Sequence, residues 1–240
     1  MSGQTSWLMD GVITHVQLVP GPEGATLPVT GEDVSYYMDL VALSVPFPAL
    51  PDVAIVLAAL AGYAFIGIIP DLDPTIGSYV PDPLVEVRQN ETHRALVQRL
   101  AERNGALFFV EPTGPGTNRA YWGASPRVGV PQPVLSINLG PETNVRSLSF
   151  AADLSSPTFV DRVVQGNFGE DIEVTGSGEL DVWRYQAVLR PRRLVNVRGA
   201  GSTFDGLWYV KSVKHTIRAA SYLQAFQLER GGLGTTISSV

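Results

Sequence analysis

The chain has 240 residues, a formal net charge of −6 and no cysteine, which excludes disulfides and thiolate metal sites. The acidic balance argues against a nucleic-acid-binding protein, because such proteins carry a basic face. Glycine and proline are abundant, at 24 and 18 residues, and favour many turns between short strands. The N-terminal MSGQTSWLMDG lacks the charged and apolar regions of a secretory signal, so we expect no signal peptide.

Residues 11–30 are predicted to form a β-hairpin. From Val12 onward apolar and polar residues alternate, and the segment PGPEG then reverses the chain into a return strand. Pro28 lacks an N–H group, which favours an edge position for that return strand. Residues 33–43 are predicted to form one short helix, because the segment opens with an acidic turn.

The segment Asp52–Ile69 is predicted to be a buried core helix. It is mostly apolar between Pro51 and Pro70, and Pro51 with Asp52 suits a helix start. A membrane span is the alternative, since about 20 apolar residues are usually required. No lysine or arginine flanks the run, which favours the core helix.

Residues 90–104 carry the clearest helix pattern of the chain. Asn90 is a possible N-cap and Gly105 suits the left-handed position after the last turn. One apolar stripe is expected to face the core: Leu96, Val97, Leu100 and Ala101. A hairpin follows, with strands at 107–110 and 120–122, so the region 51–125 reads as an α+β insert.

The remaining chain is predicted to be mostly strands. After a Pro-rich connector at 126–144 we expect strands at 145–151 and 159–165, a loop at 166–178 and a short helix within 178–189. Three further strands are expected at Leu194–Arg198, Leu207–Ile217 and Tyr222–Glu229. In the middle one the alternation slips between Val210 and Val213, which predicts a bulge. Bent, bulged antiparallel strands are how small barrels close.

Catalytic motifs are not found in the sequence. It has neither a G-x-S-x-G elbow nor a Walker loop. His15, His93 and His215 are isolated, without metal-ligand spacing. The acidic pairs Asp71/Asp73 and Glu170/Asp171 lack the glycine and distal glutamate of a calcium loop and are interpreted as solvated acids. We therefore expect no enzyme, no cofactor and no metal.

The order and spacing of several segments resemble a known family. The C-terminal stretch reads LRPRRLVNVRGAGSTFDGLWYVKSVKHTIRAASYLQAFQLERG. Upstream pieces agree with it: Asp10–Thr14, Val29–Asp33, Ala120–Gly123, Val130–Pro133 and Gly140–Val145. Together they resemble the phage late control D family, the baseplate hub proteins of contractile tails and related injection systems. A weak internal repeat, MDGVITHVQLV…ATLPVTGED against FDGLWYVKSVKHTI…YLQAFQLER, fits the two related barrels of that family.

The resemblance implies an α+β, mainly β fold, with two related antiparallel β-barrel-like domains flanking a smaller α/β insert. The expected boundaries are 1–46 for a partial first barrel that faces the tail tube, 47–140 for an insert with two helices and a hairpin, and 141–240 for the second barrel. The first segment is too short to close a barrel by itself.

The resemblance also implies a structural hub subunit that assembles in the cytoplasm into a phage tail or injection particle. Its expected partners are two further copies in a trimeric ring, the sixfold tail tube protein, the threefold spike protein and other baseplate proteins, with no nucleic-acid specificity and no membrane. The candidate tube and spike interface residues are Val12, Thr14, Val16, Leu27, Val29, Trp208, Val210, Lys214, Gln224 and Phe226. Alternatives are a cell-wall hydrolase or a membrane-anchored module of the same apparatus, the latter using Val53–Ile69.

Overall fold

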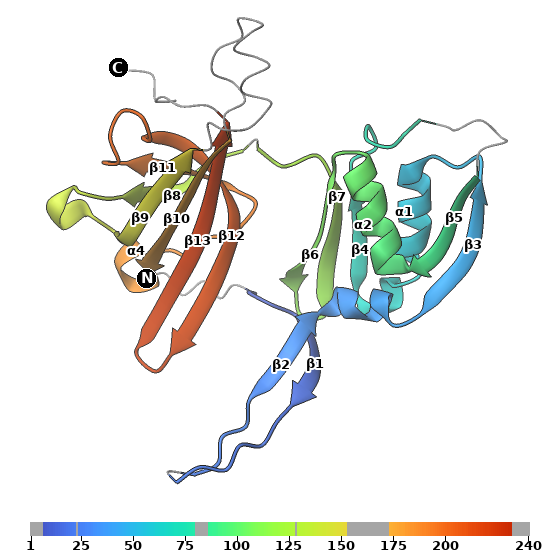
Figure 1. The fold of residues 1–240 in the computed structure, drawn as a ribbon, viewed down its shortest axis with the longest axis horizontal. Helices are drawn as coiled ribbons and strands as arrows, with labels where there is room; N and C mark the ends of the chain where they lie inside the picture. Colours follow the sequence, from blue (N-terminus) through green and yellow to red (C-terminus); the bar gives the residue numbers. More distant parts are fainter. Residues whose placement is uncertain (1–6, 23, 80–85, 128, 153–172, 232–240) are drawn as a thin grey trace, which may run out of the picture. The chain divides into compact units, whose positions relative to one another are not determined.

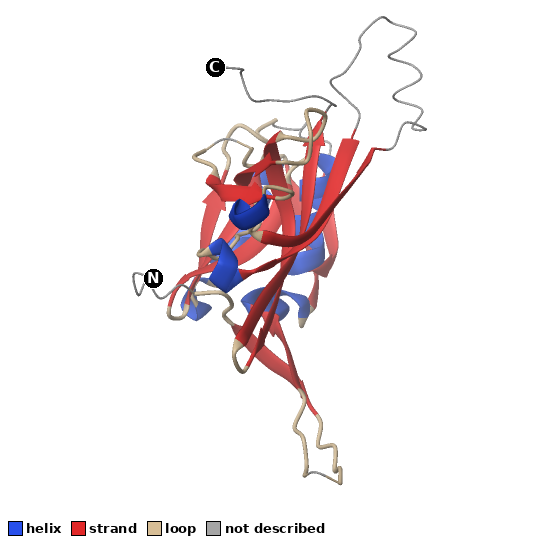
Figure 2. Cartoon of the chain, turned by 90° about the vertical axis from the view of Figure 1, so that its left-hand side faces the viewer, coloured by secondary structure: helices blue, strands red, loops and turns tan. Residues whose placement is uncertain are grey.

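The computed structural model describes residues 7–22, 24–79, 86–127, 129–152 and 173–231 (Figure 1). The chain forms two compact units, 2–125 and 126–240, and each has its own hydrophobic core. The predicted boundaries at 46 and 140 divide the chain more finely and stay a prediction. Strands are far more abundant than helices in the described structure (Figure 2), so the expectation of a mainly β fold is confirmed.

The described part of the first unit contains three small sheets. They are β1–β2, β3–β5 and β4–β7–β6, and all strand pairs are antiparallel except the parallel pair of β4 with β7. Its elements are β1 (Gly11–Val16), β2 (Val29–Asp33), η1 (Val34–Asp39), β3 (Ala42–Pro48), α1 (Asp52–Ala61), η2 (Ala64–Ile66), β4 (Ile68–Leu72), β5 (Glu86–Thr92), α2 (His93–Arg103), β6 (Leu107–Gly114) and β7 (Thr117–Gly123).

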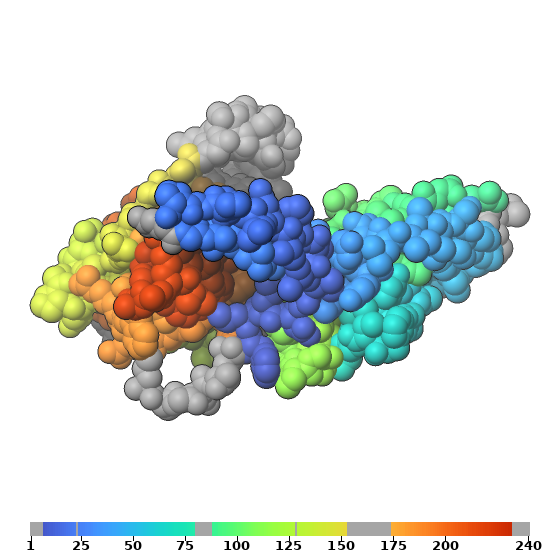
Figure 3. Space-filling view, turned by 90° about the horizontal axis from the view of Figure 1, so that it is seen from below, coloured from blue at the N-terminus to red at the C-terminus, as the bar shows by residue number. Residues whose placement is uncertain are grey.

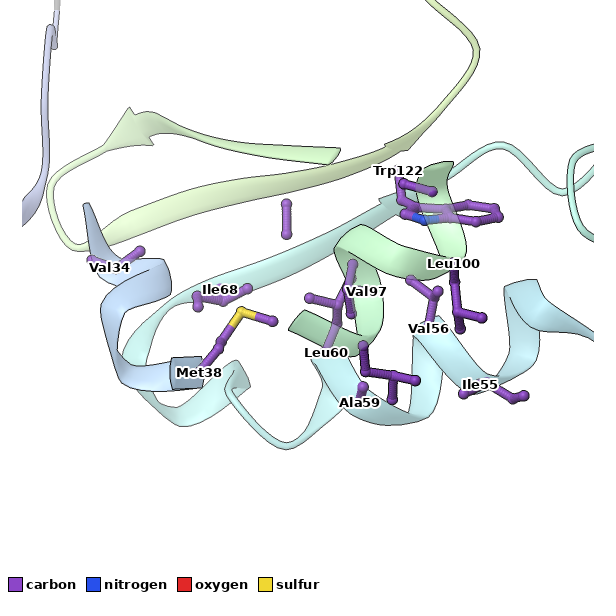
Figure 4. Packing of buried hydrophobic residues seen from close by; sticks show 13 residues of the cluster. Val34, Met38, Ile55, Val56, Ala59, Leu60, Ile68, Val97, Leu100 and Trp122 are labelled. Atoms are coloured by element: carbon purple, nitrogen blue, oxygen red, sulfur yellow. The ribbon is translucent and has the colours of Figure 1, made fainter. Parts of the chain in front are cut away.

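The core of the first unit lies where α1 and α2 meet η1, β4 and β7 (Figure 4). Leu60, Leu100 and Trp122 are fully buried in it. The carboxylate of Asp52, at the start of α1, accepts hydrogen bonds from Arg103 Nε at 2.8 Å and Asn104 Nδ2 at 2.7 Å. This acid therefore ties the start of α1 to the end of α2.

The predicted long helix is shorter in the structure and ends in a strand. α1 stops at Ala61, and the chain then turns through Gly67, whose φ of 82° is left-handed. A Cβ at Gly67 would lie 1.9 Å from the Gly116 carbonyl oxygen, so the close approach of β4 to the β6–β7 turn needs glycine. No helix within the described ranges is long and apolar enough to cross a membrane.

For the second helix, α2, the predicted apolar stripe is confirmed, but the predicted N-cap is wrong. Its four stripe residues are buried and Gly105 is left-handed, as expected. The N-cap is Thr92, whose Oγ1 accepts from the Ala95 N–H at 3.2 Å, because Asn90 belongs to β5. The predicted helix at 33–43 is a 3-10 helix capped by Asp33, and the chain then continues into β3.

The described part of the second unit is organised on one six-stranded sheet, in the order β8-β11-β12-β13-β10-β9. The sheet curls into a half-barrel (Figure 1), and β8 with β11 is its parallel pair. Its elements are β8 (Gln132–Ser136), η3 (Gly140–Glu142), β9 (Val145–Ala152), β10 (Glu173–Asp181), α4 (Val182–Tyr185), β11 (Leu194–Arg198), β12 (Gly206–Arg218) and β13 (Ser221–Gly231).

Two predictions for this unit need correction, and two are confirmed. The connector contains the edge strand β8, and β10 replaces the end of the predicted loop. The short helix expected within 178–189 is present as α4. The bulge in the long strand is present, between Val210 and Ser212. The predicted strand at 159–165 lies outside the described residues.

Two glycines in β10 explain why the sequence predicts a loop where the structure has a strand. A Cβ at Gly176 would lie 3.1 Å from the Phe150 ring, and one at Gly178 would lie 2.7 Å from the Phe226 ring and 2.4 Å from the Ser147 carbonyl oxygen. Glycine usually weakens a strand. Here it leaves room for aromatic rings to lie over the strand.

We expect Gly178→Ala to destabilise the second unit by about 1–3 kcal/mol, the usual cost of overpacking. The control is Thr175→Ala, which also introduces alanine on β10 but at an exposed position. Thermal unfolding checks this, and equal melting temperatures for the two variants would contradict it.

Candidate functional site

The first candidate surface is the hairpin arm, residues 11–31, which comprises β1, its turn and the first part of β2. It extends away from the helices of its own unit (Figure 1), and the space-filling view shows the described part of the arm from its far end (Figure 3). The described strands β1 and β2 pair only with each other. An isolated two-stranded sheet is marginally stable in water.

A bulge sorts the side chains of the arm onto two different faces. The register pairs Ile13 with Gly31 and Val16 with Val29, with an irregularity between Ile13 and His15. Ile13, Val16 and Val29 therefore share one face, because residues two apart on a strand point the same way. His15 and Thr30 pair on the opposite face. One face of the arm thus carries an apolar patch, and the other is mainly polar, although Val12 also lies on it.

The predicted interface residues of the first segment all belong to this arm. Val16, Leu27 and Val29 expose 54%, 60% and 50% of their surface, Thr14 is exposed and Val12 is partly exposed. Ile13 was not predicted, although it is 65% exposed. With strict alternation, Ile13 and Val16 would lie on opposite faces of the strand. The bulge between them brings the two side chains to the same face.

The predicted residues of the second unit lie mostly in its core. Trp208, Val210, Gln224 and Phe226 are buried, whereas Lys214 is exposed. The bulge in β12 and the curl of the sheet turn these side chains inward. The guanidinium of Arg230 lies over the Trp208 ring at 4.5 Å and adds to this packing.

The second candidate surface is the serine row, formed by Ser149, Ser177, Gln227 and Ser212. These residues are direct cross-strand partners on β9, β10, β13 and β12. Two hollows of about 340 and 500 Å³ lie along the row. The hydroxyls are already hydrogen-bonded: Ser149 Oγ lies 3.0 Å from Ser177 Oγ, and Ser212 Oγ donates to Gln227 Oε1 at 3.2 Å.

Amide side chains hold the inner side of the half-barrel. The Leu189 N–H donates to Gln224 Oε1 at 2.9 Å, and Gln224 Nε2 donates to the Leu189 carbonyl at 2.8 Å. Gln132 makes the same pair of bonds with Arg190, at 2.8 and 2.9 Å. The two glutamines thus take the place of a neighbouring strand for this segment.

Gln224→Leu is expected to destabilise the second unit by about 2–4 kcal/mol, since each buried backbone group left without a partner costs about 1–3 kcal/mol. Gln227→Leu, on the exposed face of the same strand, is the control. Chemical denaturation of both variants measures the difference, and equal midpoints would show that the Gln224 bonds to Leu189 do not stabilise the unit.

Among the described residues, the three histidines lie apart from one another in the fold and do not form a catalytic cluster. His15 is exposed on the arm. His93 Nδ1 lies 2.9 Å from the Tyr63 hydroxyl, and His215 Nδ1 lies 2.8 Å from that of Tyr222. Within the described ranges, no three His, Cys, Asp or Glu side chains are placed to hold a metal ion.

Burial lowers the pKa of His215, and the positive charge of Arg190 lowers this pKa further. The unfolded chain therefore binds a proton more readily than the folded chain does. Stability falls as the pH drops below the ordinary histidine value of about 6.5. We expect calorimetric melting temperatures to fall between about pH 7.5 and 5.5, and His215→Asn to reduce that slope. His15→Asn is the control, and an unchanged slope in His215→Asn would contradict the assignment.

Comparison with known proteins finds solved structures with a similar fold, but no matching sequence family. No family model matches the chain, and no curated protein matches it. The tail protein from Neisseria meningitidis MC58 superposes with a TM-score of 0.65 and 13% identity, covering 92% of this chain and 80% of that one. The 43 kDa tail protein of prophage MuSo2 from Shewanella oneidensis gives a TM-score of 0.61 and 15% identity, covering 92% and 76%.

At these identities the similarity is one of fold. It extends over nearly the whole chain, through both units, and over most of each tail protein. The chain therefore has the fold of these two tail proteins.

Proposed function

We propose that this chain is a structural subunit of a phage tail or of a phage-tail-like contractile injection system, and that it acts in the baseplate hub. The observation that carries the proposal is the fold similarity to two tail proteins across 92% of the chain. The order and spacing of the late control D-like segments in the sequence give separate support. In this role the chain forms a ring of three copies between the sixfold tail tube and the threefold spike.

The hairpins of the two units support a repeated architecture. Each opens with Asp-Gly, at Asp10-Gly11 and at Asp205-Gly206, and each carries a bulge in its first strand. In the proposed ring, two related β-rich parts per chain supply six positions from three copies, which matches a sixfold tube. In each copy, the half-barrel of the second unit would occupy one of the six ring positions. The part of the first unit that carries the hairpin arm would occupy the next.

The exposed surfaces also suit a subunit that functions inside an assembly. The hairpin arm leaves an apolar face and two strand edges uncovered among the described residues. Free edges of this kind are liabilities in a monomer, and contact with neighbouring subunits covers them.

Co-expression with the tube and spike proteins of the same gene cluster tests the proposal. Image reconstruction of the assembled particle is expected to show three copies of the chain in one ring, with the tube on one face and the spike on the other. Six copies in the ring, or a single copy without tube contact, would refute the role of symmetry adaptor.

A further inference from the structure

The hairpin arm needs a partner for its apolar face. Ile13, Val16 and Val29 lie together on that face, while His15 and Thr30 occupy the other. An amphipathic sheet normally packs its apolar face on a core. β1 and β2 contact mainly each other and η1, and Glu32 of β2 also pairs with Arg94 of α2. Ile13, Val16 and Val29 each keep at least half of their surface exposed, so the structure leaves this face open.

The chemistry of the arm restricts what that partner is. From Gly11 to Gly31 the single charged residue is Glu23. A surface for nucleic acid or for anionic lipid headgroups needs lysine and arginine, and the arm has none. Its partner therefore presents an uncharged protein surface with space for branched aliphatic side chains.

The serine row has these properties and is present on every copy of the chain. Its side chains are short, the two hollows along it provide space, and its hydroxyls are satisfied within the row. Covering it with an apolar face therefore leaves no serine hydroxyl without a hydrogen bond, which keeps the desolvation cost low.

The charges beside the two surfaces are mostly engaged within the chain. Next to the hairpin arm, Glu32 pairs with Arg94, and Asp33 accepts from the Ser35 N–H at the start of η1. At the edge of the hollows, Lys211 pairs with Glu229 and Glu179 pairs with Arg146. These charges therefore keep their partners when the two surfaces meet, and the fit depends on shape and on apolar area.

We propose that the apolar face of the hairpin arm docks on the serine row of a neighbouring copy of the chain. The inference rests on the proposed ring, because a closed ring needs two different surfaces that meet head to tail. The arm and the row are two such surfaces, one with large apolar side chains and one with short side chains and hollows. Around three copies, each arm covers the row of the next copy.

The absence of cysteine in the chain permits a direct test. A tagged chain carrying Ile13→Cys is mixed with an untagged chain carrying Ser149→Cys, Ser177→Cys or Ser212→Cys, and the assembled protein is mildly oxidised. A disulfide forms only where the two Cα atoms approach within about 7 Å. We expect a disulfide-linked tagged–untagged pair for at least one of the three. The matched control, Thr30→Cys on the polar face of the arm, is expected to give at least about tenfold less.

A second measurement follows the assembly itself. Ile13→Glu with Val16→Glu is expected to raise the dissociation constant of the trimer by at least about a hundredfold, since each buried charge without a partner costs several kcal/mol. Thr30→Glu is expected to change it less than about threefold. Light scattering gives the mass, and circular dichroism verifies that both variants are folded.

The outcomes separate this inference from the proposed function. A trimer that forms without any of the three cross-links, and tolerates the glutamates, overturns the arm–row contact and leaves the ring intact. A cross-link found only within one chain of the Ile13→Cys/Ser177→Cys double variant also overturns it. A chain that stays monomeric in the presence of tube and spike proteins overturns both.

Discussion

The structure depends above all on hydrogen-bond partners for backbone groups that lie outside regular strands. In the half-barrel, Gln132 and Gln224 complete the segment at Leu189–Arg190 with paired amide bonds. Asn144 joins the two edges of the same sheet: Ser136 N–H donates to its Oδ1, and its Nδ2 donates to the Val134 carbonyl, both at 2.8 Å. These three amide side chains thus supply hydrogen bonds to backbone groups that have no partner strand. A purely apolar interior would leave those backbone groups unpaired.

The features that could be predicted from the sequence are those set by near neighbours. The stripe of α2, the left-handed Gly105 and the bulge after Val210 each follow from a short pattern. Features set by distant contacts were missed. Gly67 looks like a helix residue until Gly116 comes close to it, and Gly178 looks like a loop residue until the Phe226 ring packs over it.

The same distinction applies to the candidate surfaces. The hairpin and its exposed residues follow from alternation and from the turn sequence. The place of Ile13 does not follow, because one bulged residue exchanges the faces of β1. For β12 and β13 the sequence predicts the strands but not which face is inward, since that choice is made by the curl of the whole sheet. Phe226 is therefore a core residue, while Lys214 from the neighbouring strand stays outside.

The strand order has a consequence for the way the chain is synthesised. β12 and β13 are the last described strands to leave the ribosome, yet they lie at the centre of the sheet, between β11 and β10. The pairs β8–β11 and β9–β10 cannot join into one sheet until β12 and β13 have both emerged. The first unit pairs its strands only among themselves, so it can fold while the second unit still exposes open edges. Domains generally fold in this N-terminal-first order during synthesis. A chain cut before β12 is therefore expected to keep the first core and to lose the entire half-barrel, which leaves it prone to aggregate through unpaired strands.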